Sequence, residues 1–256
     1  MHIERREFLG VRFDPVSSDQ ALARLAEVTG ATPYSYVVTP NVDHVVRLHD
    51  KEWIEAKLKA IYDEADLCLC DSKVLHVLAR FRGVRLPVVV GTDLASLVFD
   101  RLVESGDRIA IVGGSDAMVR ILEQKYPRVD FVRHNPPMDL RWNLDARRAA
   151  AEFIAESGAR FSFIAVGSPQ QELIAAEVKS ISGAVGTAFC IGAALDFITG
   201  RQRRAPRLAR LLGLEWAHRL VSDPRRMWRR YLLKGPRVFV LAYRWAGDPH
   251  HSPASK

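Results

Sequence analysis

Short β-rich runs alternate with amphipathic segments along the first 200 residues of the chain. The β-rich runs lie at residues 36–39, 67–70, 87–90, 108–112, 131–132, 161–166 and 184–190. Segments with the apolar spacing of helices lie at residues 43–48, 72–82, 94–105, 115–126, 146–157 and 173–182. Repeated strand–helix units build a mostly parallel sheet with helices on both faces. The alternation therefore predicts a Rossmann-like α/β fold.

The size of the chain suits one large domain with an appendage. It has 256 residues, of which 48% are hydrophobic, so it can bury a full core. It has no run of about 18 apolar residues, and its N-terminus lacks the apolar stretch of a secretory signal. We therefore expect a cytoplasmic protein. Cys68, Cys70 and Cys190 lie in apolar runs, which favours buried reduced thiols over a disulfide or metal framework.

The positive charge of the chain is concentrated near its C-terminus. The formal net charge is +7, yet residues 201–244 alone hold thirteen Lys or Arg against two acids. Residues 1–200 are mildly acidic. A basic segment on an acidic body indicates docking to an anionic partner, either a membrane surface or a polyphosphate. We expect an α/β domain at 1–200, a basic, amphipathic, helical C-terminal appendage at 201–245 and a disordered tail at 246–256.

A polar loop follows the apolar run at residues 161–166. Its sequence is Gly167-Ser-Pro-Gln-Gln-Glu172, and a helical segment comes directly after it. Open α/β sheets bind ligands at the carboxyl ends of their strands. The amide of Gln171 and the carboxylate of Glu172 are therefore candidates for a binding site.

Polar groups follow three other predicted strands. They are Thr39-Pro-Asn41, Asp71-Ser72 and, after Gly192, Asp196. Each has a simpler interpretation, because Asn41 or Asp71 can cap the next helix and Asp196 can pair with a nearby arginine. Together, however, they place polar side chains at the ends of four strands, which favours a shared site on one edge of the sheet.

Two further motifs carry less weight. The glycines before Ser115 resemble a nucleotide-binding turn, but they lack the spaced-glycine fingerprint, and Ser115 as the cap of a helix is an equal interpretation. Asp63-Glu-Ala-Asp66 could suggest a helicase box or a metal site. The chain has no Gly-x4-Gly-Lys-Ser/Thr loop for a triphosphate, so a solvated helix end is the preferred interpretation.

These motifs, in this order, resemble the WecG/TagA/CpsF family of bacterial glycosyltransferases from about residue 36 to residue 242. The matching segments are Thr39-Pro-Asn41, Asp71, Gly83-x3-Pro87-x3-Gly91-x-Asp93, Gly167-Ser-Pro-Gln-Gln-Glu172, Gly192-x3-Asp196-x3-Gly200, Arg204-Ala-Pro206, Gly213-Leu-Glu-Trp216-x2-Arg219, Pro224 and Arg229-Arg230-Tyr231. The chain departs from the family pattern at two positions. Asp71 is followed by Ser72 where glycine is usual, and Gln170 stands where Lys or Arg is common.

The resemblance implies an inverting transfer of a sugar from a UDP-sugar to a polyprenyl-diphosphate-linked sugar. N-acetylmannosamine is the expected donor sugar and glucose an alternative. By family position, Asp71 is the catalytic base, which takes the proton of the acceptor hydroxyl. Thr39 and Asn41 would orient a sugar, and Asp196 would bind the ribose. Gln171 would contact the sugar or the diphosphate, while Glu172 would fix the loop.

The leaving diphosphate needs positive charge, and the chain has no convincing Asp-x-Asp motif for a metal. We therefore expect no metal or other cofactor, and arginines in its place, because the guanidinium fork matches phosphate oxygens. The resemblance implies that the appendage supplies them and brings the enzyme to the inner face of the cell membrane. The candidates are Arg204, Arg219 and Arg230.

The residues of the appendage suit a membrane surface. Leu208, Leu211, Leu212, Trp216 and Leu220 share one helical stripe, and a second helix starts at Pro224 and stops at Gly235-Pro236. In that helix arginines lie opposite Trp228 and Tyr231. Basic residues beside Trp and Tyr favour a membrane interface. A core-packed helix pair with a solvated basic face is the alternative.

Two other functions compete with sugar transfer. A nucleic-acid-binding protein would also use the arginine-rich helices, but it would not need polar side chains at four strand ends. A soluble sugar-nucleotide hydrolase would consume the donor without a lipid acceptor. We expect no nucleic-acid partner, and the oligomeric state, including a homo-oligomer, stays open.

Overall fold

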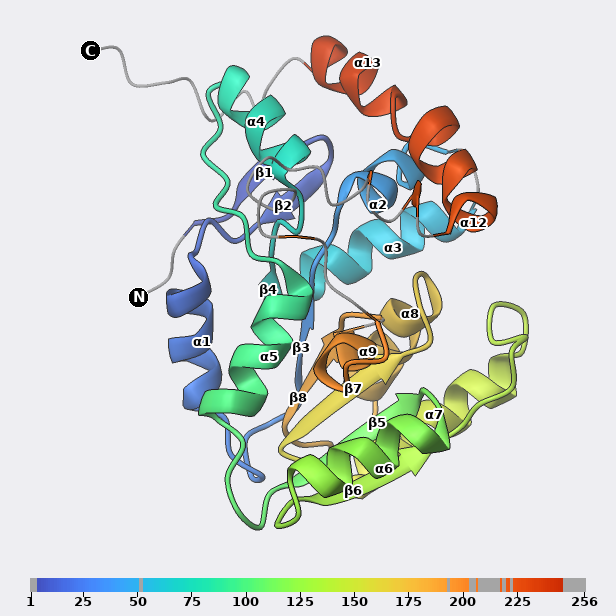
Figure 1. Ribbon diagram of the computed structural model, residues 1–256. Coiled ribbons are helices and arrows are strands. Elements are labelled where there is room, and N and C mark those ends of the chain that lie inside the picture. The colour runs from blue at the N-terminus through green and yellow to red at the C-terminus, as the bar shows by residue number, and fades with distance from the viewer. Residues whose placement is uncertain are drawn as a thin grey trace.

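The computed structural model describes residues 4–50, 53–192, 194–202, 206, 217, 220–221 and 223–245. A six-stranded sheet forms its centre, in the order β4-β3-β8-β7-β5-β6, and every neighbouring pair is parallel (Figure 1). The strands are β3 (Ser35–Val38), β4 (Leu67–Cys68), β5 (Arg108–Gly113), β6 (Asp130–His134), β7 (Phe161–Ala165) and β8 (Thr187–Cys190). The predicted α/β fold is thereby confirmed.

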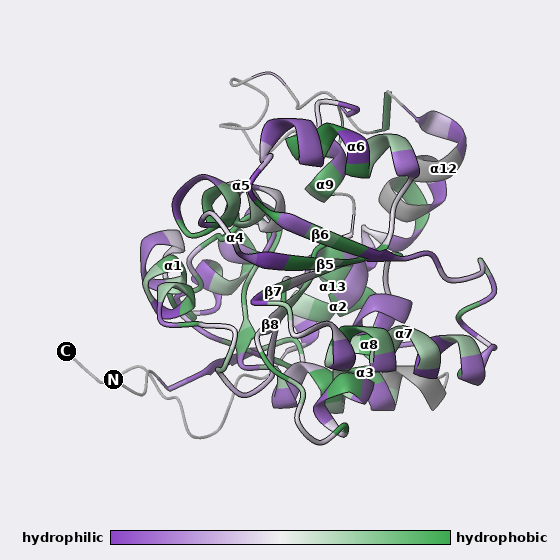
Figure 2. Ribbon diagram, turned by 90° about the horizontal axis from the view of Figure 1, so that it is seen from below, coloured by the Kyte–Doolittle hydropathy of each residue, from purple (hydrophilic) through white to green (hydrophobic). Residues whose placement is uncertain are grey.

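Helices cover both faces of the sheet, as Figure 2 shows from its edge. One face carries α2 (Val42–Arg47), α3 (Trp53–Glu64), α7 (Leu144–Ser157) and α8 (Gln170–Lys179). The other carries α1 (Ser18–Ala26), α5 (Gly91–Arg101), α6 (Asp116–Lys125) and α9 (Ala194–Ile198). Successive strand residues alternate between the two cores: Tyr36 and Val38 enter the first, and Val37 enters the second.

The predicted helix starts follow from their caps. Ser115 Oγ accepts a hydrogen bond from Met118 N at the start of α6, and Asn41 Oδ1 accepts one from Asp43 N at the start of α2. Ser72 Oγ accepts from Leu75 N and starts α4 (Lys73–Phe81). The helix ending at Asp63-Glu-Ala-Asp66 is also present, because α3 ends at Glu64.

The expectation of a strand at residues 87–90 is wrong. Only Val88 pairs there, in a single parallel bridge with Cys70, and α5 begins at Gly91. Too few residues remain between the bridge and the helix for a ladder. The sequence predicted only the end of α3, and it did not predict α1 or the N-terminal hairpin of β1 (Arg6–Phe8) and β2 (Val11–Phe13). This hairpin packs its apolar side chains into the first core.

The described part of the C-terminal segment consists mainly of helices. They are α12 (Pro224–Trp228), the π-helix η1 (Arg229–Lys234) and α13 (Arg237–Arg244), so the predicted start at Pro224 and stop at Gly235-Pro236 are confirmed. Val238 and Ala242 of α13 are buried, and α13 lies against α2 and α4 (Figure 1). The ring of Trp245 meets that of Phe8 edge-on at 5.1 Å. An ion pair of 2.6 Å between Arg237 and Asp50 joins α13 to the segment after α2.

Several predicted features of the appendage lie outside the described residues. Arg204, Arg219 and the tail at 246–256 belong to this group, as do Leu208, Leu211, Leu212 and Trp216 of the apolar stripe. The backbone of Arg230 lies in η1, but its side chain is not described. Within the described residues, no helix is both long and apolar enough to span a bilayer.

Candidate functional site

Four neighbouring strands bring the predicted site residues to one edge of the sheet. In the order β4-β3-β8-β7 the strands are parallel, so the loops that follow them emerge side by side. Asp71 N donates to Pro40 O at 3.1 Å, which joins the loops after β4 and β3. Gly192 N donates to Gln171 Oε1 at 3.0 Å, which joins the loop after β8 to the first turn of α8, the helix that follows β7. The strand order thus gathers residues that are more than a hundred positions apart in sequence.

The loop after β3 is packed against the first residue of α5. Thr39 is buried, and a Cβ atom added to Gly91 would lie 2.8 Å from Thr39 Oγ1 and 2.9 Å from Ile191 Cγ2. Only glycine allows the helix start to come this close to the ends of β3 and β8. Asn41 follows on the same loop and is half-buried as the cap of α2.

Asp71 lies half-buried at the end of the chain segment that follows β4. Its neighbour Ser72 has a φ of −160°, which is extended backbone that any residue adopts. The turn therefore does not require the glycine that is usual in the family at this position. Ser72 instead caps α4, so the cap interpretation belongs to Ser72 rather than to Asp71.

Gln171 is buried with its amide fully engaged by the protein. Only 4% of the residue is exposed. Its Nε2 donates to Cys190 O and to Glu172 Oε1, both at 3.0 Å, and its Oε1 accepts from Gly192 N. These bonds clamp the start of α8 to the end of β8. The ligand contact expected for Gln171 would have to compete with them.

Gln171 and Glu172 lie in the first turn of α8, which begins at Gln170, rather than in the loop that the sequence predicted. The carboxyl of Glu172 is less fully hydrogen-bonded than the amide of Gln171. Glu172 is 2% exposed, and its Oε2 has no hydrogen-bond partner among the described residues. Burial raises the pKa of the Glu172 carboxyl above its ordinary value, because an ionised carboxylate is poorly solvated there. Its Oε1 lies 3.9 Å from Nε2 of His44.

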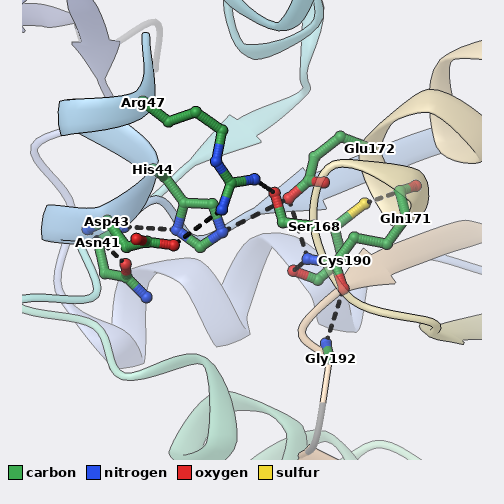
Figure 3. A network of polar contacts seen from close by, with 9 residues as sticks. All are labelled: Asn41, Asp43, His44, Arg47, Ser168, Gln171, Glu172, Cys190 and Gly192. Carbon is green, nitrogen blue, oxygen red and sulfur yellow. Dashed lines mark hydrogen bonds and ion pairs between the residues drawn. The ribbon is translucent and has the colours of Figure 1, made fainter. Parts of the chain in front are cut away.

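The first two turns of α2 contribute side chains that the sequence did not single out. Arg47 pairs with Asp43 at 2.8 Å and donates to Ser168 Oγ at 3.2 Å, which links α2 to the loop after β7 (Figure 3). His44 lies between Asn41 and Glu172 in the same network. Their spacing could have indicated them, because His44 and Arg47 follow Asn41 at intervals of three residues and therefore lie on one face of the helix.

Asp196 lies in α9, on the loop side of β8. Its Oδ1 is 4.0 Å from Nε of Arg201, and both side chains are partly exposed, as the simpler interpretation of a pairing with arginine expects. Arg201 also donates to Ser115 Oγ, which joins the segment after α9 to the turn after β5. No cluster of three or more His, Cys, Asp or Glu capable of holding a metal ion occurs among residues 4–50, 53–192 and the other described positions.

A parallel sheet with polar loops at the carboxyl ends of its strands defines a Rossmann-like α/β protein with its candidate site at that edge. A comparison with family models identifies the group more narrowly. The model described as "Glycosyl transferase WecG/TagA/CpsF family" matches residues 6–251, nearly the whole chain. The chain therefore belongs to this family of glycosyltransferases of cell-surface polysaccharide synthesis, as the motifs indicated.

Proposed function

We propose that this protein is an inverting glycosyltransferase that moves a hexose or N-acetylhexosamine from a UDP-sugar to a polyprenyl-diphosphate-linked sugar. N-acetylmannosamine is the expected donor sugar and glucose the alternative. The observation that carries the proposal is that four neighbouring parallel strands end in polar segments at one edge of the sheet, with Asp71 after the outermost of them, in a member of this family. Open α/β sheets bind their ligands at the carboxyl ends of the strands, which supports that edge as the nucleotide site.

Asp71 is the proposed base. Its carboxylate takes the proton of the acceptor hydroxyl while the hydroxyl oxygen attacks the anomeric carbon. The bond from that carbon to the donor diphosphate breaks, and its electron pair leaves with the nucleotide. A single displacement of this kind inverts the anomeric configuration. Asp71 suits the role by position, since its backbone is hydrogen-bonded to the loop that carries Thr39 and Asn41.

The other strand-end residues share the binding of substrates in this proposal. Thr39 and Asn41 orient the sugar beside Asp71, and Asp196 accepts hydrogen bonds from the ribose hydroxyls. The contacts of Gln171 favour a positioning role in place of the ligand contact expected from the sequence, because its amide is already bonded to Cys190, Glu172 and Gly192. Glu172 supports the same region of the site, because its Oε1 accepts from Gln171 Nε2 and faces His44 of α2.

In this proposal, arginines rather than a metal ion stabilise the negative charge that develops on the leaving diphosphate. The arginines proposed to bind the diphosphate are the candidates in the appendage, Arg204, Arg219 and Arg230. Their guanidinium groups can bind two phosphate oxygens at once. A membrane-bound acceptor would bring the appendage and the diphosphate together, so docking and charge stabilisation would be coupled.

Exposed apolar side chains on the described C-terminal helices support membrane docking. Trp228, Leu232, Leu233, Phe239, Val240 and Tyr243 are all exposed, Tyr243 at 83%. Val77 and Phe81 are exposed on α4, which lies beside α13. Basic residues are interspersed on the same helices: Arg225, Arg229, Lys234, Arg237 and Arg244. Apolar side chains with basic neighbours suit the boundary of an anionic bilayer on the cytoplasmic side.

Replacing Phe239 and Tyr243 together by serine is expected to weaken binding to anionic vesicles at least about tenfold, because each inserted aromatic side chain contributes roughly 1 kcal/mol or more. Sedimentation with vesicles of phosphatidylglycerol and phosphatidylcholine measures the effect. Leu144→Ser, an exposed apolar residue at the start of α7, is the matched control. Equal binding by the double variant and the wild type would rule out α13 as the docking surface.

The transfer reaction is tested with a panel of UDP-sugars and a short-chain polyprenyl-diphosphate sugar. We expect one donor to be consumed only with the acceptor, an inverted linkage in the product, and full activity in excess EDTA. Consumption of the donor without acceptor would favour the hydrolase alternative. Loss of activity in EDTA, restored by a divalent cation, would overturn the assignment of arginines.

A further inference from the structure

His44 connects two of the loops that form the candidate site. It is the third residue of α2, and its Nδ1 accepts a hydrogen bond of 3.1 Å from Asn41 N. On the other side of the ring, Nε2 faces Oε1 of Glu172 at 3.9 Å (Figure 3). The His44 side chain is only 12% exposed. The imidazole therefore bridges the loop after β3 and the start of α8.

The bond from Asn41 fixes the protonation state of the ring in this structure. An imidazole nitrogen that accepts a hydrogen bond must carry a lone pair, so Nδ1 is unprotonated and the ring proton lies on Nε2. A second proton would occupy Nδ1 and point at the N–H of Asn41. The hydrogen bond would then be lost, while the attraction between the ring and Glu172 would grow. Histidine is the side chain that makes such a change near neutral pH.

Charged and titratable groups on neighbouring elements face the pair. Burial raises the pKa of the Glu172 carboxyl, while hydrogen bonds with Gln171 and Ser168 and the charge of Arg47 act to lower it. Arg47 lies on the same helix and forms an ion pair with Asp43 at 2.8 Å, so its positive charge is shared between Asp43 and Glu172. Tyr62 of α3 and Cys190 of β8 also face Glu172, and burial raises the pKa of both, which keeps them neutral.

We propose that His44 is a positioning residue whose protonation state controls the loop that carries Thr39 and Asn41. The neutral ring holds the loop through Asn41 N. The doubly protonated ring releases that N–H and pairs with Glu172. The consequence for catalysis rests on the proposed function, because this loop is the one assigned to orient the sugar beside Asp71. Sugar transfer should then decline on the acidic side of the His44 titration.

His44→Gln separates this control from the structural role of the side chain. Glutamine at the third helix position is the usual partner in a capping box, and its Oε1 accepts from the N-cap N–H at every pH. We expect the variant to transfer sugar within about twofold of the wild type at pH 8. One pH unit below the midpoint of the wild-type acidic limb, the variant should be about tenfold faster, since it cannot be protonated.

The matched variant is His44→Ala, which removes the acceptor and should be slow at all pH values. An acidic limb of His44→Gln that coincides with that of the wild type would overturn the proposal. Glu172→Gln keeps an acceptor for Gln171 but removes the negative charge. It should move the midpoint of the His44 titration to lower pH, because the protonated ring loses the carboxylate that faces it.

Nuclear magnetic resonance tests the switch without any assumption about the reaction. In the full-length wild type, the ¹⁵N signals of the His44 ring should show the Nε2–H tautomer at high pH. The amide signal of Asn41 should follow the titration of that ring, and it should stay constant in His44→Gln. An Nδ1–H tautomer, or an Asn41 amide that ignores the titration, would overturn the proposal. If no donor is transferred at any pH, the proposed function fails, whereas these spectra still decide the switch.

Discussion

Replacing Asp71 by asparagine is expected to lower the rate of sugar transfer about 1000-fold, within the range that a general base contributes. Asparagine has nearly the same shape as aspartate, but its amide cannot accept the proton of the acceptor hydroxyl. Binding of the nucleotide should change little, because Asp71 acts on the acceptor in the proposed mechanism. The measurement is kcat with a saturating donor, together with calorimetric titration of UDP.

Asp116→Asn is the control for the removal of a carboxylate. Asp116 starts α6, its side chain is 77% exposed, and its ion pair is with Arg133. This variant should retain the activity of the wild type. An Asp71→Asn enzyme with undiminished kcat would remove Asp71 from the role of base. Loss of the thermal unfolding transition in Asp71→Asn would indicate a structural role, so the thermal unfolding of both variants is measured in parallel.

Gly186→Ala is expected to destabilise the protein by about 2–5 kcal/mol, the sum of the costs of a left-handed backbone and of overpacking. Gly186 has a φ of +78°, and an added Cβ would lie 2.2 Å from Ala159 O and 2.6 Å from Arg160 O. These are backbone atoms in a tight network. Thr187 N donates to Arg160 O, and Gly186 N donates to Thr32 O, so neither side can withdraw cheaply.

Gly183→Ala is the matched control in the same connection between α8 and β8. Its φ is +81°, but a Cβ atom there would meet nothing within 4 Å. It should cost only the backbone strain, about 1–2 kcal/mol. The melting temperature should therefore fall by roughly 10 °C for Gly186→Ala, and by far less for Gly183→Ala. Equal shifts would mean that the contact with Ala159 does not limit this position.

Local signals in the sequence predicted most of the elements of the sheet domain. Strands β5 and β7 and helices α4 and α6 lie within a residue or two of their expected bounds, because apolar periodicity and capping residues act over short distances. The failures also have local causes. Residues 87–90 are apolar like a strand, yet the helix that begins at Gly91 leaves room for only one bridge.

The sequence predicted which residues follow the strands, but it did not predict how these segments are arranged relative to one another. The polar residues after each strand were visible because strands end at Gly, Pro and Asn. Nothing in the sequence indicated that β3 pairs with β8, whose partner residues are about 150 positions away. That pairing, together with the pairing of β8 with β7, brings His44 to Glu172.

The sequence by itself determined the α/β class, the family, and the residues that stand at the strand ends, because these depend on local spacing and on the order of motifs. Tertiary structure alone decided what the side chains do there. Gln171 and Glu172 are neighbours in sequence, yet the amide bonds to Cys190, Gly192 and Glu172, while Oε2 of the carboxyl has no hydrogen-bond partner within the described part of the chain. Burial and hydrogen-bond partners come from other elements of the fold, so adjacent residues acquire different roles only when the sheet is assembled.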